Sequence, residues 1–72
     1  MRAVGTLISW HSVGRHGIVR SDDGGDVFVG GRDLVRSGIG DDLQIGMRLS
    51  FEPRQEQPGR PPRALNIRVV PV

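Results

Sequence analysis

Residues 15–29, Arg15-His16-Gly17-Ile18-Val19-Arg20-Ser21-Asp22-Asp23-Gly24-Gly25-Asp26-Val27-Phe28-Val29, decide the fold of this chain. Two short runs that contain β-branched and aromatic residues flank a turn rich in Asp and Gly, and this pattern is typical of a β-hairpin. Because side chains alternate between the two faces of a strand, we expect His16, Ile18 and Phe28 to share one face. That face is the candidate site.

The chain on either side of the hairpin predicts three further strands. Residues 3–10 are rich in β-branched side chains, and Gly5 is a point where the strand can bend. Residues 47–52 and 64–70 alternate apolar and polar side chains. Residues 30–42 are punctuated by glycine and predict a long loop, in which Arg32 to Val35 have room for one helical turn. Five short strands without a long helix predict a small closed antiparallel β-barrel, since closure removes exposed edges.

Alternation along these strands predicts which side chains point inward. The expected inward set is apolar throughout: Ile8, Val19, Val27, Val29, Leu49, Phe51, Leu65 and Ile67. Strict alternation also places Trp10 on the same face as Ile8, unless a β-bulge lies between them.

Four blocks of the sequence resemble the cold-shock domain family. Its two ribonucleoprotein motifs are Lys-Gly-Phe-Gly-Phe-Ile and Val-Phe-Val-His, and the corresponding segments here are Gly14-Arg15-His16-Gly17-Ile18-Val19 and Val27-Phe28-Val29-Gly30. The other matching blocks are Ser9-Trp10, Leu43-x-x-Gly46-x-x-Leu49-x-Phe51-Glu52 and Ala64-Leu65-Asn66-Ile67. The resemblance covers nearly the whole chain, 1–72, as one domain. It implies an all-β fold, a five-stranded antiparallel oligonucleotide-binding barrel.

The resemblance also implies a set of residues that bind nucleic acid. Trp10, His16 and Phe28 are expected to stack on bases from an outward-facing platform, which for Trp10 requires the bulge. Arg60 corresponds to a basic residue of the last loop, and Arg15 takes the place of the first motif's lysine. Ile18 stands where the family has a phenylalanine, and Gly30-Gly31 replace a His-Phe pair. The platform of this diverged member is therefore reduced, and we expect weak binding.

The charge distribution favours a modest basic surface. All ten cationic residues are arginine and the formal net charge is +2, so the sequence pI of 11.0 reflects the lack of Lys, Tyr and Cys more than a large positive excess. Six aspartates lie within residues 21–42, whereas residues 1–20 contain no acid. If the acidic segment lies to one side, about three arginines (Arg15, Arg20 and Arg60) are expected to reach the phosphates of a strand.

The sequence offers no pattern for catalysis, a metal or a cofactor. Its two histidines, His11 and His16, have no cysteine or third ligand at metal spacing, and the aspartate pairs lie beside glycines, where turns favour them. No run approaches a membrane span and no signal peptide is visible, which favours a cytoplasmic location. We therefore expect a non-enzyme without cofactors that binds single-stranded RNA or DNA with low sequence specificity, as an RNA chaperone or regulator of gene expression. The alternative is a protein-interaction module, or the N-terminal domain of a longer chain, that retains the barrel but has lost most nucleic-acid binding.

Overall fold

The first three strands form an antiparallel meander. The computed structural model describes residues 2–40 and 42–71. Its first strands are β1 (Ala3–His11), β2 (His16–Ser21) and β3 (Asp26–Gly30). β1 pairs with β2 and β2 pairs with β3, both in antiparallel register, so the hairpin predicted at residues 15–29 is confirmed.

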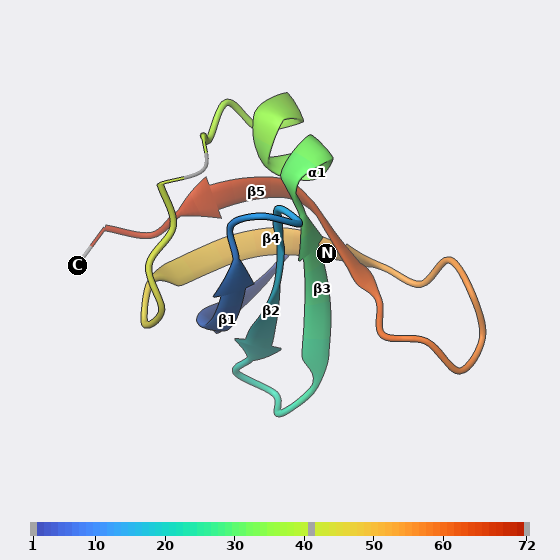
Figure 1. The fold of residues 1–72 in the computed structure, drawn as a ribbon. Coiled ribbons are helices and arrows are strands. Elements are labelled where there is room, and N and C mark those ends of the chain that lie inside the picture. The colour runs from blue at the N-terminus through green and yellow to red at the C-terminus, as the bar shows by residue number, and fades with distance from the viewer. Residues whose placement is uncertain (1, 41, 72) are drawn as a thin grey trace.

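Two more strands close this sheet into a barrel of order β1-β2-β3-β5-β4 (Figure 1). β4 (Arg48–Arg54) pairs antiparallel with both β1 and β5 (Arg63–Val69). β3 meets β5 in parallel, through the register pair Phe28 and Arg63, and the Phe28 N–H donates to the Pro62 carbonyl at 2.8 Å. The prediction of a closed five-stranded β-barrel is confirmed. The expectation that the barrel is purely antiparallel is wrong, because the long connection from β3 to β5 lets these two strands run in the same direction.

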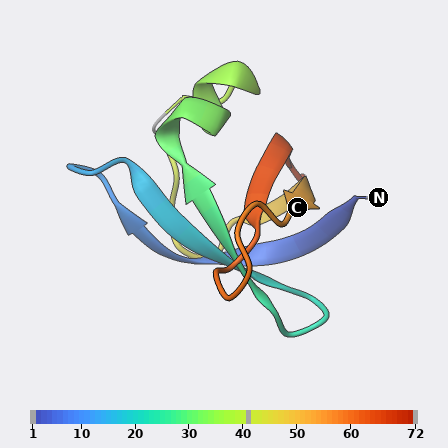
Figure 2. The same ribbon diagram turned by 90° about the vertical axis from the view of Figure 1, so that its right-hand side faces the viewer.

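A short helix, α1 (Gly31–Arg36), follows β3 within the segment predicted as a loop, and it includes the helical turn expected at Arg32 to Val35. Six residues do not form a stable helix alone, so tertiary packing must hold it. Leu34 is fully buried in the core, and the backbone N–H of Ser37 donates to the carbonyls of Asp33 and Leu34. Figures 1 and 2 show α1 above one end of the barrel and the β2–β3 turn at the other end.

A β-bulge in β1 decides which way the first strand's side chains point. Leu7 pairs with Val19 and Ser9 pairs with Ile18, so Ile8 is the extra residue between them. Leu7 is fully buried and Ile8 is 37% exposed, and the expectation that Ile8 points inward is therefore wrong. The bulge that the sequence suggested is present, and it turns Ile8 outward.

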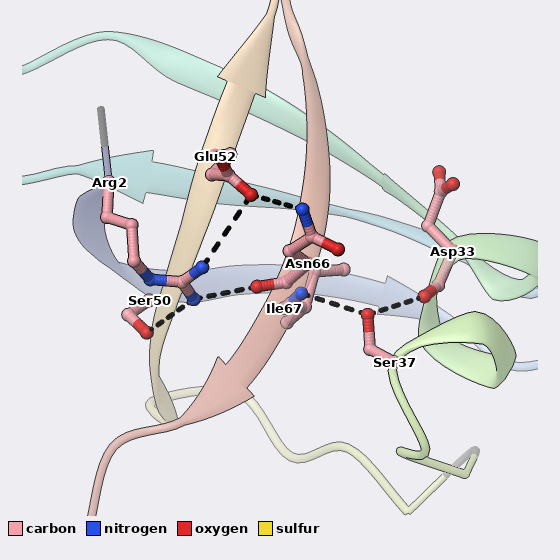
Figure 3. Close-up of polar contacts among 7 residues, drawn as sticks. All are labelled: Arg2, Asp33, Ser37, Ser50, Glu52, Asn66 and Ile67. Carbon is pink, nitrogen blue, oxygen red and sulfur yellow. Dashed lines mark hydrogen bonds and ion pairs between the residues drawn. The ribbon is translucent and has the colours of Figure 1, made fainter.

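A second bulge, in β5, is held by side chains from three other segments (Figure 3). Asn66 lies at φ 50°, a left-handed conformation that asparagine tolerates better than most residues. The Arg2 guanidinium donates to the Asn66 carbonyl at 2.7 Å, and the Ile67 N–H donates to Ser37 Oγ at 2.9 Å. Ser37 Oγ donates in turn to the Asp33 carbonyl at 2.8 Å, so the bulge also anchors the C-terminal end of α1. Backbone groups that the bulge removes from the strand ladder thus find partners.

The β5 bulge also corrects the predicted core. Ala64 is fully buried in place of Leu65, which is only half-buried, because the bulge shifts the alternation along the strand. The remaining predicted inward residues are buried, and Leu7 of β1, Leu34 of α1 and the loop residue Leu43 join them. The core consists of Leu7, Val19, Val27, Val29, Leu34, Leu43, Leu49, Phe51, Ala64 and Ile67. Among the described residues, no helix is long and apolar enough to cross a membrane.

Candidate nucleic-acid interface

The outward face of the β1–β2–β3 meander carries a row of rings. His11 pairs with His16 across β1 and β2, and Ile18 pairs with Phe28 across β2 and β3. The His11 and His16 ring centroids lie 4.9 Å apart at an interplanar angle of 34°, and those of His16 and Phe28 lie 6.1 Å apart at 17°. We call His11, His16, Ile18 and Phe28 the ring face. His11 was not predicted from the sequence, and it is the β1–β2 register that places it opposite His16.

Trp10 does not share this face, contrary to the expectation from the family resemblance. It pairs with Gly17, and residues 17 and 19 of β2 are both buried and point to the barrel interior. The indole is half-buried and packs against the core. A Cβ on Gly17 would lie 3.0 Å from Trp10 Cε3 and 2.3 Å from the Ser9 carbonyl oxygen, so only glycine permits this close approach. The bulge at Ile8 therefore places Trp10 on the inward side at the end of the barrel.

Two open hollows flank the Phe28 ring. The first, of about 310 Å³, lies toward the β4–β5 loop and is lined mainly by Phe28, Arg54, Glu56, Arg60, Pro61 and Arg63. We call it the loop hollow. The second lies toward α1, is lined mainly by Phe28, Gly30, Gly31, Arg32, Asp33 and Arg36, and again includes Arg63. We call it the helix hollow. Arg60, which the sequence analysis selected, is thus brought beside Phe28.

Arg15 lies at the far side of α1. It has φ 54°, and its carbonyl accepts a hydrogen bond from the Gly31 N–H at 2.7 Å, which joins the β1–β2 turn to the helix. Arg15 and Arg32 line a third shallow hollow that continues from the helix hollow. The predicted site residues therefore divide into His16, Ile18, Phe28 and Arg60 around the ring face, Arg15 beyond α1, and Trp10 on the inward side.

The arginines around the two hollows differ in whether they have acidic partners. Arg32, Arg36, Arg54 and Arg60 are exposed, and the guanidinium group of none of them forms an ion pair or hydrogen bond with another described residue. Arg63 forms ion pairs with Glu56, at 2.8 Å, and with Asp33, at 3.1 Å. The unpaired guanidinium groups therefore lie on both sides of Phe28.

At the β2–β3 turn, by contrast, arginines are neutralised. Arg48 donates to both carboxylate oxygens of Asp22 at 2.7 Å, and these hydrogen bonds lower the pKa of Asp22 below its usual 3.8. Arg20 donates from Nε to Asp26 at 3.0 Å, which raises the pKa of Arg20 above its usual value. The expectation that Arg20 reaches a phosphate is not supported by this pairing.

Five neighbours of Phe28 were not predicted from the sequence: Arg63, Asp33, Arg32, Arg36 and Arg54. Arg63 reaches it through the parallel pairing of β3 with β5, which alternation along single strands cannot reveal. Asp33, Arg32 and Arg36 reach it because residues predicted as a loop form α1.

Comparisons with known proteins identify no relative: no family model matches the chain, and no curated protein matches it. Within residues 2–40 and 42–71, no group of three or more His, Asp or Glu side chains is arranged to hold a metal ion. The ring face and the hollows beside it offer flat rings that can stack on bases and guanidinium groups that can bind anions.

Proposed function

We propose that the protein binds single-stranded nucleic acid across the ring face, as a diverged protein of the cold-shock type with an oligonucleotide-binding barrel. The observation that carries the proposal is an exposed Phe28 between two hollows whose rims hold unpaired arginines. Stacking on a ring tolerates every base, and arginines position the phosphates of the same strand.

The arrangement favours a single strand over a duplex. Phe28 stacks with His16 in the row of rings and is 38% exposed, so it presents a ring face or edge that only an unpaired base can cover. The unpaired arginines are divided between α1, which has only six residues, and the end of β4 with the loop that follows it, so they do not line one long helix or β-ribbon that would enter a major groove. In the cell, this binding would serve a cytoplasmic RNA chaperone or a regulator of gene expression, without a catalytic step.

The test is a titration with fluorescently labelled eight-nucleotide RNA and DNA strands and the matched duplex, at 50 and 200 mM salt. We expect single strands to bind more tightly than the duplex. With three or four phosphates neutralised, the slope of log K against log salt should be about −2 to −3. Duplex binding as tight as single-strand binding, or no binding by the folded protein, would overturn the proposal and leave the protein-interaction module as the explanation of the exposed face.

A further inference from the structure

The helix hollow has an acidic floor beside an aromatic wall. A methyl group built on Gly30 would lie 3.4 Å from Phe28 Cε1 and 3.6 Å from Asp33 Oδ2. The ring edge and the carboxylate therefore border the same small space, and glycine at position 30 leaves that space open. The Gly30 backbone is extended, with φ −104° and ψ 150°, so its conformation does not require glycine.

The Asp33 carboxylate has an ion-pair partner but no hydrogen-bond donor among the described residues. Its side chain is only 6% exposed, and no described residue donates a hydrogen bond to either oxygen. Arg63 Nε lies 3.1 Å from Oδ2, but the geometry is not that of a hydrogen bond, and Nε is itself buried without a partner. Buried polar groups are nearly always hydrogen-bonded, so Arg63 Nε, which faces the Asp33 carboxylate without bonding to it, is an exception that calls for an explanation.

The carboxylate is also not what holds α1 in place. The main-chain carbonyl of Asp33 accepts the Ser37 hydroxyl, and Ser37 in turn is bound by the Ile67 N–H. In Figure 3 the carboxylate of Asp33 points away from this network and takes no part in it. An acceptor that is buried, has no hydrogen-bond donor and lies at the floor of an open hollow is suited to a ligand that brings N–H donors.

We propose that the helix hollow selects guanine at one position of the bound strand, with Asp33 as the specificity-determining residue. This inference rests on the proposed function. The Watson–Crick edge of guanine presents two adjacent donors, N1–H and the N2 amino group, and a carboxylate accepts two parallel N–H bonds. The O6 acceptor beside them would face the guanidinium groups of Arg32, Arg36 or Arg63 at the rim.

The other bases fit this floor less well. Adenine and cytosine place a ring-nitrogen acceptor next to their amino donor, and uracil and thymine flank their single N–H with two carbonyls. Each of them would direct a lone pair at the carboxylate. A phosphate is disfavoured at the same point because both groups are anionic. A well-placed bidentate contact discriminates bases by a factor of about five or more.

The experiment uses an eight-nucleotide thymidine strand and versions with one central dG, deoxyinosine, 2-aminopurine deoxynucleoside, dA or dC. A single guanine avoids four-stranded structures. We expect dG to bind at least about fivefold more tightly than thymidine at that position. Strands with deoxyinosine, which lacks the N2 amino group, or 2-aminopurine, which lacks N1–H, should bind with affinities between those of the dG and dA strands.

Variants assign the preference to Asp33. In Asp33→Asn, the ratio of dG to thymidine affinity should fall to about one, because an amide presents only one acceptor. The matched control is Asp26→Asn, since Asp26 also contacts an arginine Nε, at 3.0 Å, but lies at the opposite end of β3. That variant should keep the ratio. Gly30→Ala, at ordinary contact distances, should fold normally and lower the ratio by filling the opening, which keeps the test decisive if Asp33→Asn is unstable.

The two proposals fail separately. If the all-thymidine strand does not bind, the proposed function is wrong. If it binds and dG is no tighter, or if folded Asp33→Asn keeps the dG preference, the guanine inference is wrong while single-strand binding stands. Tightest binding of dC or dA would likewise overturn it.

Discussion

The two ends of strand β3 use arginine in opposite ways. At the β2–β3 turn, Arg20 and Arg48 are bound by the carboxylates of Asp26 and Asp22. At the other end, toward α1 and the β4–β5 loop, exposed arginines surround Phe28 without acidic partners among the described residues. The difference shows that net charge is a poor guide to an anion-binding surface. A chain with a net charge of +2 can still gather unpaired arginines in one region, here beside Phe28.

The largest effect is expected at the ring between the two hollows. Phe28→Ala removes the exposed phenyl ring, and the loss of one stacked base should weaken single-strand binding by about 1 to 3 kcal/mol, or about 5-fold to 150-fold. The measurement is a titration with labelled strand at constant salt. Ile45→Ala is the control, because Ile45 is 69% exposed but lies outside the hollows that border Phe28. Equal affinities for the two variants would contradict the role of Phe28.

A smaller effect should separate the two groups of arginines. Arg60→Ala removes an unpaired guanidinium from the loop hollow, and the salt slope should become shallower by about 0.7 as one phosphate contact is lost. Arg20→Ala removes a guanidinium that Asp26 already neutralises, and its slope should match that of the wild type. The comparison fails if Arg20→Ala changes the slope as much as Arg60→Ala does.

The smallest effect concerns the stability supplied by the turn. Because hydrogen bonds from Arg48 lower the native pKa of Asp22, the pair stabilises the folded state above the ordinary carboxyl pKa of 3.8. That contribution is lost as the pH falls through the lowered native value. Asp22→Asn should therefore reduce the melting temperature slightly at pH 7, with a difference that disappears in strong acid. A difference that persists at pH 2 would show that the effect does not come from ionisation of Asp22.

Much of the barrel is readable from the sequence because alternation reports directly which face of a strand is buried. The hairpin, the strand around Phe51 and the last strand follow from that pattern. Ile8 and Leu65 were misplaced because a bulge reverses the alternation, and its exact position depends on how neighbouring strands coil around the core. The outward position expected for Trp10 came from the family resemblance, whereas strict alternation places Trp10 on the inward face, where it packs against the core.

The site residues also divide into those that the sequence predicts and those that it does not. His16, Ile18 and Phe28 share a face because the hairpin register fixes it, and the sequence predicts that register locally. The Asp33–Arg63 pair joins residues from α1 and β5, and it depends on the parallel contact of β3 with β5 and on a helix too short to be stable alone. Contacts of this kind arise only when the whole barrel closes.

The central claim is that a single strand lies on the Phe28 end of the barrel and avoids the acidic turn. The most direct measurement is a ¹H–¹⁵N correlation spectrum of the protein titrated with an eight-nucleotide single strand. We expect the backbone amide signals of His16, Ile18, Phe28 and Arg60 to shift, while those of residues 22–26 stay in place. Shifts confined to residues 22–26, or no shifts at all at saturating strand concentration, would contradict the account.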